Sequence, residues 1–151
     1  MSTNQTLHNI GILISNGFNE SDVAYCLSQL RMAGLSTSLI GAIDNTIYSR
    51  HGLQVRPDKS LNSLGKESHF SLLIIPGGRE CVNNLLTLPG FHTQLERNGR
   101  NGGYIAILKD AEAALQKANL FTCPENNKVL SQSDQPLALF CQQLIEVSKT
   151  N

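Results

Sequence analysis

The chain has 151 residues, 40% of them hydrophobic, and its 12 basic side chains balance its 12 acidic ones. This size predicts one domain over residues 1–151 with its own core, and residues 1–7 are expected to be disordered. Without a run of like charge, neither nucleic acid nor an anionic membrane is expected as a partner. No apolar run is long enough to span a bilayer, and the N-terminus lacks a basic targeting region, so a cytoplasmic protein is expected.

The chain begins with a strand, helix and strand pattern. Residues 8–15 form a short β-branched apolar run, typical of a central strand that is buried on both faces. Apolar residues then recur at helical spacing over 23–33, and Gly34 is expected to cap that helix at its C-terminus. Residues 35–40 predict a second strand, parallel to the first because a single helical crossover joins them.

The next segment contains an exposed hairpin and a buried strand. Residues 46–49 and 53–56 indicate the two arms of the hairpin, and 57–60 are interpreted as the turn that ends it. A short helix or turn over 61–64 follows. The strongly apolar run 69–75 then predicts a buried strand.

Helical patterns over 80–86 and 91–96 lead to a glycine-rich loop at 98–103, which matches no phosphate-binding motif. A strand is expected over 104–108, and a helix with small residues on one face follows from Ala111.

The last segment is interpreted as a loop at 121–127, an edge strand at 128–131 and an amphipathic helix over 137–148, with Pro136 near its start. The alternation of strands and helices along the chain predicts an α/β fold with a mostly parallel central sheet.

Two strand ends supply candidate functional residues. Lys109 directly follows the strand 104–108 at a strand-to-helix corner, and such corners point into the ligand site of an open α/β sheet. A nucleophile elbow would have Ser or Cys there and Gly two residues later, whereas this chain has Lys109 and Ala111. Gly77 and Gly78 end the strand before it and form either an anion cradle or a plain turn.

The cysteines and histidines do not form a recognisable metal or cofactor motif. The chain has four cysteines, Cys26, Cys81, Cys123 and Cys141, which are widely spaced without a C-x-x-C pair. About two or three of them are expected to be buried structural thiols. The histidines are equally dispersed, so no metal and no cofactor is predicted: His8, His51, His69 and His92.

The order of these elements resembles the ThiJ/PfpI superfamily over roughly residues 8–147. The stretches that carry the resemblance are Gly17-Phe18, 22–25, His51-Gly52 with Val55 and Asp58, 73–79, and Leu130-Ser131 with Pro136. The resemblance implies a flavodoxin-like three-layer sandwich and a homodimer. It leaves the function open, because that family includes cysteine-dependent glyoxalases or deglycase-like enzymes, peptidases, hydratases, chaperones and inert domains.

Position by position, the resemblance implies that the catalytic residues of the family are missing. The nucleophilic cysteine of the family falls on Lys109, the residue after it on Asp110, and the small glycine that follows on Ala111. The glutamate that hydrogen-bonds the cysteine falls on Asn19, with Glu20 one place off. The segment 121–127 is also shorter than its counterpart in many members.

Part of an oxyanion hole remains in the pattern. Gly77, Gly78 and the amide after Lys109 match what such a site needs, but donors without a nucleophile do not make a covalent hydrolase. Cys81 lies three residues after Gly78 and is a weaker candidate nucleophile, although a helix N-terminus can lower the pKa of a thiol.

The favoured hypothesis is a non-catalytic domain that binds a small ligand or a partner, or stabilises a homodimer. Its candidate ligand-binding residues are Gly77, Gly78, Lys109, Asp110 and Asn19. The alternative is an enzyme of altered chemistry, acting on small carbonyl compounds through a Schiff base at Lys109, or glyoxalase-like or hydrolytic through Lys109 or Cys81. Asp110 and Glu112 flank Lys109 and favour its charged form, so a solvated or salt-bridged lysine is expected.

Two further hypotheses are weaker. A redox sensor would use one of the four cysteines, but only Arg79 near Cys81 offers a pKa-lowering neighbour. His51, in the hairpin, is a candidate for the dimer interface rather than for catalysis.

Overall fold

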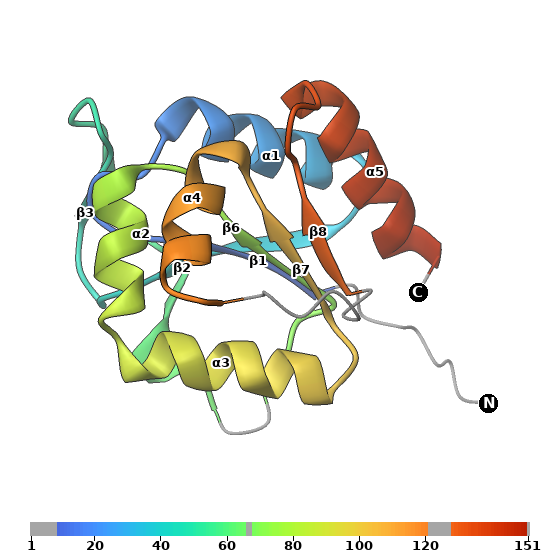
Figure 1. Ribbon diagram of the computed structural model, residues 1–151. Helices are drawn as coiled ribbons and strands as arrows, with labels where there is room; N and C mark the ends of the chain where they lie inside the picture. The colour runs from blue at the N-terminus through green and yellow to red at the C-terminus, as the bar shows by residue number, and fades with distance from the viewer. Residues whose placement is uncertain (1–8, 66–67, 121–127, 151) are drawn as a thin grey trace.

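The computed structural model describes residues 9–65, 68–120 and 128–150 and is built around a sheet of six parallel strands (Figure 1). The strands are β1 (Asn9–Ile14), β2 (Ser36–Gly41), β5 (Lys59–Ser60), β6 (Leu72–Ile75), β7 (Tyr104–Ile107) and β8 (Val129–Ser131). Their order across the sheet is β5-β2-β1-β6-β7-β8, so the first strand is central and the last lies at an edge, as the sequence predicts.

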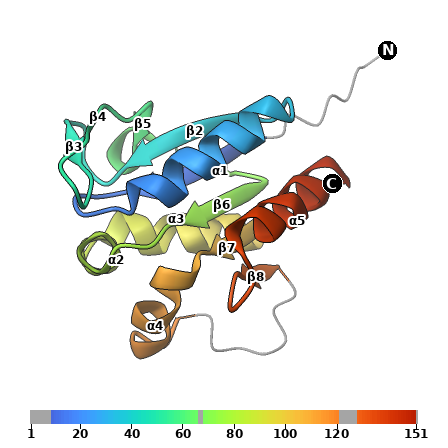
Figure 2. The same cartoon turned by 90° about the horizontal axis from the view of Figure 1, so that it is seen from above.

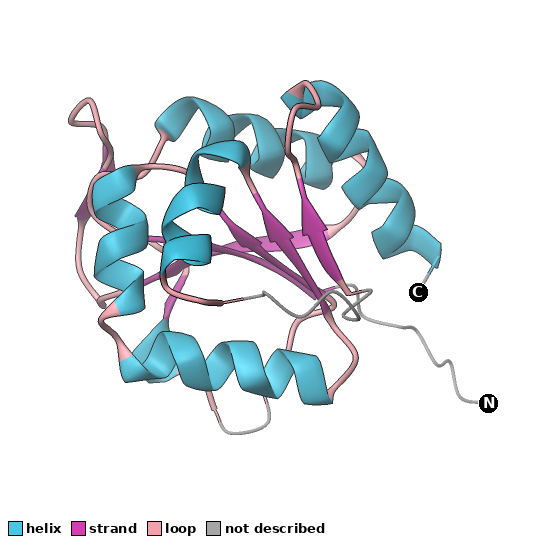
Figure 3. Cartoon of the chain, viewed as in Figure 1, coloured by secondary structure: helices cyan, strands magenta, loops and turns pink. Residues whose placement is uncertain are grey.

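Helices cover both faces of the sheet. They are α1 (Glu20–Met32), α2 (Arg79–Leu86), α3 (Pro89–Arg100), α4 (Lys109–Lys117) and α5 (Leu137–Thr150). Figures 1 and 2 show α1 and α5 together on one face and α3 across the opposite face, and α2 packs side by side with α4. Figure 3 shows the resulting helix, sheet and helix layers. The predicted three-layer sandwich is therefore confirmed.

The two central strands are apolar on both faces because helices cover both. Every residue of β6 is buried, as is every residue of β1 after Asn9. This explains why both strands are continuous apolar runs in the sequence rather than alternating patterns.

The predicted hairpin is present outside the main sheet. Its arms are β3 (Ile47–Tyr48) and β4 (Gln54–Val55), which pair antiparallel, and a short 3₁₀ helix, η1 (Leu61–Ser63), follows. Residues 57–60 are not only a turn, because β5 joins the sheet there. Asp58 positions this segment through two hydrogen bonds to Leu39. Its carboxylate accepts from the Leu39 N–H at 2.8 Å, and its own backbone N–H donates to the Leu39 carbonyl at 2.9 Å.

The helix α3 is longer than the sequence predicts. It extends to Arg100, through residues interpreted as a glycine-rich loop. Asn98 explains the difference: its buried side chain donates to the Phe70 carbonyl at 2.9 Å and accepts from the Phe70 N–H at 3.0 Å. This pair of hydrogen bonds holds the last turn of the helix against the segment that precedes β6.

Some sequence expectations fall outside the described residues: the disorder of 1–7, the loop at 121–127, and the burial of Cys123. Among the residues that the structure does describe, no helix has the combination of length and hydropathy that a membrane span requires.

Candidate functional site

The carboxyl ends of β1, β6 and β7 bring three connections together. These are the β1–α1 loop (residues 15–19), the β6–α2 turn (76–78) and the start of α4. The Asn19 N–H donates to the Gly77 carbonyl at 3.0 Å, and the Asn19 Nδ2 donates to Asp110 Oδ2 at 3.2 Å. The sequence-predicted residues Asn19, Gly77 and Asp110 therefore meet at one place.

The two glycines of the β6–α2 turn allow close packing. Gly78 has φ +112°, and a Cβ added there would lie 2.3 Å from the Gly17 carbonyl oxygen. A Cβ added at Gly77 would lie 2.3 Å from Asp110 Cβ. Neighbouring atoms thus occupy the space that a side chain at Gly77 or Gly78 would need. This close approach explains why both positions require glycine.

Lys109 is the first residue of α4 and is exposed. Its backbone N–H donates to Oε1 of the buried Gln132 at 2.8 Å, which fixes the start of the helix. Within the described residues its ammonium forms no ion pair. Of the two alternatives for this lysine, the solvated one fits the structure.

The salt-bridged alternative, in which Lys109 pairs with its acidic neighbours, is not formed within the described residues. Asp110 Oδ2 lies 3.7 Å from Arg50 Nη2, and Glu112 Oε1 accepts from the Ser133 N–H at 2.7 Å. Arg50 belongs to the hairpin and was not singled out from the sequence. Its own N–H donates to the Phe18 carbonyl at 2.8 Å, so the hairpin contacts the site through both backbone and side chain.

Glu20 faces the hairpin. It accepts hydrogen bonds from the Ser49 hydroxyl and from the His51 N–H at 3.0 Å, and its Oε1 lies 2.9 Å from His51 Nδ1. These bonds, that from Ser49 above all, lower the pKa of Glu20 from 4.5 to about 2. Glu20 therefore fastens the hairpin to α1. The interface role of His51 stays a prediction.

Asp22 is a site residue that sequence reasoning missed. Asn19 caps α1 by accepting from the Asp22 N–H at 3.2 Å, and its Nδ2 donates to Asp22 Oδ2 at 3.1 Å as well as to Asp110. Burial raises the pKa of Asp22, the charge of Asp110 raises it further, and Arg50 lowers it. The signal was present as an acidic residue three positions after a capping Asn.

The thiols in the described residues belong to the hydrophobic core. Cys26, Cys81 and Cys141 are buried, as predicted. Burial is the main cause that raises the pKa of Cys81 to about 12, so this thiol is a poor nucleophile and the alternative that uses it has no support in the geometry. Within residues 9–65, 68–120 and 128–150, no three potential ligands gather where a metal ion would bind.

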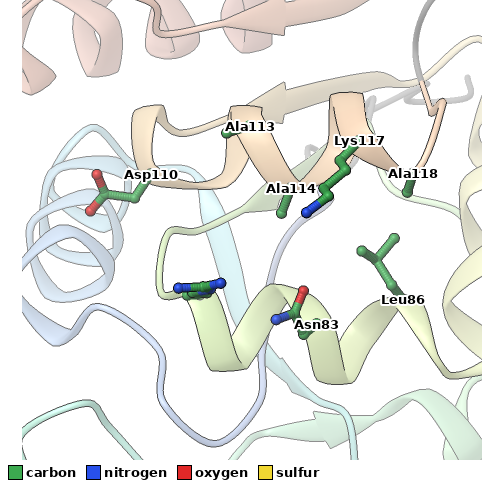
Figure 4. A pocket seen from close by; sticks show the side chains of 8 residues that line it. Asn83, Leu86, Asp110, Ala113, Ala114, Lys117 and Ala118 are labelled. Carbon is green, nitrogen blue, oxygen red and sulfur yellow. The ribbon is translucent and has the colours of Figure 1, made fainter.

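A groove of about 520 Å³ runs between α2 and α4 and begins at the site. Its lining residues are Arg79, Asn83, Leu86, Asp110, Ala113, Ala114, Lys117 and Ala118. Figure 4 shows Lys117 extending across the groove toward Asn83, while Asp110 at one end points away from it. The groove thus has an alanine-rich wall on α4 and basic side chains from both helices.

Comparison with known proteins places this geometry in context. A model of the DJ-1/PfpI family matches residues 8–128. The Parkinson disease protein 7 homolog of Danio rerio is 24% identical over 106 residues, which cover 69% of this chain. The match spans 56% of that relative, little more than half of its length.

Solved structures show the same fold. A mutant of a DJ-1 superfamily protein from Salmonella typhimurium is 18% identical, with a TM-score of 0.81 over 95% of this chain and 91% of its own. Oxidized Toxoplasma gondii DJ-1 is 17% identical, with a TM-score of 0.79 over 94% of both chains. Drosophila melanogaster DJ-1beta is also 17% identical, with a TM-score of 0.75 over 94% of both. These likenesses confirm the predicted flavodoxin-like α/β architecture.

Proposed function

The chain belongs to the DJ-1/PfpI family, and from that premise we propose that it is a non-catalytic member that binds a small organic anion in the groove between α2 and α4. The observation that carries the proposal is the pair of cations, Arg79 and Lys117, on opposite walls of that groove. Neither forms an ion pair within the described part of the chain.

The start of α4 supports the absence of catalysis. Lys109 stands where the resemblance to the family puts a nucleophilic cysteine, and its side chain is exposed. A lysine that forms a Schiff base is activated by desolvation or by another cation nearby, and the exposure of Lys109 removes the first of these. The nearest acids of the site, Asp22 and Asp110, are already engaged by Asn19 and lack a nucleophile to serve.

The groove fits an anion with an apolar portion. Its volume of about 520 Å³ lies within the range of small-molecule pockets. Arg79 and Lys117 would hold a carboxylate or phosphate, while Leu86 and the alanines of α4 would contact the apolar portion. Asp110 also lines the groove, but its carboxylate repels a bound anion only weakly, because it points away from the groove and its charge is paired with Arg50.

Titration calorimetry with benzoate, phenyl phosphate and inorganic phosphate tests the binding site. We expect at least one organic anion to bind, and the double variant Arg79→Ala/Lys117→Ala to weaken its binding at least tenfold. Lys149→Ala, on the exposed surface of α5, is the matched control and should bind as the parent does. Equal affinity in the double variant, or no binding of any probe, contradicts the groove as the ligand site.

Reductive trapping tests the absence of catalysis separately. The chain is incubated with methylglyoxal and borohydride, and labelled lysines are mapped by peptide mass spectrometry. A non-catalytic domain labels Lys109 no faster than the exposed Lys59 and Lys149, and the chain does not consume methylglyoxal catalytically. Selective labelling of Lys109, or turnover that Lys109→Ala abolishes, would favour the alternative enzyme.

The homodimer belongs to the same proposal. The hairpin exposes two apolar side chains, Tyr48 at 47% and Leu53 at 53%, beside His51. Burial of these side chains against a second copy would remove apolar surface from water. Light scattering should give a dimer for the parent and a monomer for Tyr48→Ser/Leu53→Ser; a monomeric parent contradicts it. A cytoplasmic location remains a prediction.

A further inference from the structure

Two buried cysteines from distant parts of the chain meet between α1 and α5. The Sγ atoms of Cys26 and Cys141 lie 3.3 Å apart, although the residues are separated by 115 positions. Both residues are almost inaccessible, with exposed fractions of 0% and 1%. Figures 1 and 2 show the two helices side by side on one face of the sheet.

We propose that Cys26 and Cys141 form a reversible disulfide bond that links α1 to α5 when the protein meets a peroxide. The sulfurs must approach by about 1.2 Å to reach a disulfide length of about 2.05 Å. A movement of this size is within reach of side-chain rotation and a small shift of one helix. The proposal does not depend on ligand binding in the groove.

The contact also differentiates the two thiols. Their shared hydrogen bond lowers the pKa of Cys141, while the same bond and burial raise the pKa of Cys26. In the proposed reaction, Cys141 is the thiol that attacks the oxidant and Cys26 is the resolving thiol. The third described cysteine, Cys81, forms no such pair.

The reaction balances with hydrogen peroxide as the oxidant. The Cys141 thiolate attacks one peroxide oxygen, the O–O bond breaks, and a sulfenic acid and one water form after proton uptake. The Cys26 sulfur then attacks the Cys141 sulfur and displaces the second water. Two thiols lose two electrons and two protons in total, and one peroxide becomes two waters. Because both sulfurs are buried, local opening of α5 has to admit the oxidant.

The disulfide bond would restrain α1, the helix whose first turn contacts the candidate site. Cys26 lies about one turn after Asp22 on α1, and the charge of Asp22 raises the pKa of both thiols. Asn19 and Glu20, at the start of the same helix, bind the β6–α2 turn and the hairpin. Oxidation would thus fix the position of the element on which both contacts depend.

Peptide mapping of the full chain tests the proposal directly. The protein is treated with hydrogen peroxide, its remaining thiols are alkylated, and it is digested without reductant. We expect a peptide pair joined through Cys26 and Cys141, an intact mass lower by about 2 Da, and reversal by dithiothreitol. We also expect a rise in Tm of roughly 5–15 °C on oxidation.

Variants separate this pair from other thiols. Cys81→Ser and Cys123→Ser should both retain the linked peptide, whereas Cys141→Ser and Cys141→Ala should lose it. The mapping of the parent chain decides the question even if a variant fails to fold. Oxidation confined to Cys123 or Cys81, or no linked peptide under peroxide, overturns the proposal.

Discussion

The β1–α1 loop and the first residue of α1 are held on two sides by different kinds of contact. On the hairpin side, Glu20 accepts hydrogen bonds from Ser49 and His51, and the bonds depend on its charge. On the other side, the backbone of Gly78 lies against the Gly17 carbonyl and leaves no room for a side chain. The first side is therefore sensitive to pH, and the second is sensitive to substitution.

Two acids only two positions apart differ in a similar way. Glu20 and Asp22 both lie in the first turn of α1, where the helix dipole favours negative charge. Hydrogen bonds nevertheless lower the pKa of Glu20, while burial and Asp110 raise that of Asp22. Immediate surroundings, rather than position on the helix, set the direction of each shift.

The largest expected effect comes from the packed side. Gly78→Ala should lower the free energy of unfolding by roughly 3–5 kcal/mol, because a positive φ is strained for alanine and the Cβ overlaps the loop. Gly52→Ala is the matched control: its φ is +89°, but nothing lies within 4 Å of its added Cβ, so roughly 1–2 kcal/mol is expected. Urea unfolding measures both. Equal losses would mean that close approach is not the cause.

The hairpin side predicts a pH-dependent step in stability. Because the pKa of Glu20 falls from 4.5 to about 2 on folding, its stabilisation is complete above about 4.5 and is lost as pH falls through about 2. Glu20→Gln should be less stable at neutral pH and should lack this step. Thermal unfolding between those values measures it, with Glu96→Gln on the exposed surface of α3 as control. A step that survives in Glu20→Gln belongs to another carboxyl group.

Asp22 should behave in the opposite way. Its raised pKa means that the ionised form is disfavoured in the folded protein, so its unfavourable contribution grows as pH rises above the ordinary value of 3.8. Asp22→Asn keeps an acceptor for Asn19 and should stabilise the fold by less than about 1 kcal/mol at neutral pH. The gain should vanish in acid. Asp44→Asn, an exposed substitution, should show no such gain, and a destabilised Asp22→Asn would contradict the assignment.

The smallest effect is expected at the exposed ion pair. Removing Arg50 should change stability by about 0.2–1 kcal/mol at low salt and less at high salt, because both partners are about half exposed. The sharper measurement is the carboxyl titration of Asp22 by NMR. Arg50→Ala should raise the pKa of Asp22 further, since Arg50 lowers it in the parent. An unchanged titration would mean that the arginine does not act on this acid.

Sequence patterns predicted the elements whose residues are all buried. They failed to predict an element boundary that depends on a single tertiary contact. The apolar runs of β1 and β6 are visible because every side chain of such strands enters the core. The end of α3 was misjudged because nearby glycines suggest a loop, whereas the bonds between Asn98 and Phe70 join residues 28 positions apart. No local pattern records that partnership.

The candidate site shows the same division. Asn19, Gly77, Gly78 and Asp110 could be predicted because strand ends gather at one edge of a parallel sheet. The sequence left a solvated and a salt-bridged Lys109 open. The pairing with Asp110 is not formed, because adjacent residues on a helix do not face each other. Arg50 was missed because its position depends on how the hairpin folds over the loop.

The strand order has a consequence for the order in which the chain is synthesised. β1 is made first and becomes the centre of the sheet, so strands are added outward on both sides of it as translation proceeds. The face of α1 that carries Cys26 is covered by α5 only after Cys141 has been synthesised, 115 residues later. At a ribosomal rate of about 5–20 residues per second, that apolar face stays uncovered for roughly 6–23 s. During that interval the nascent chain exposes apolar surface of the kind that favours aggregation.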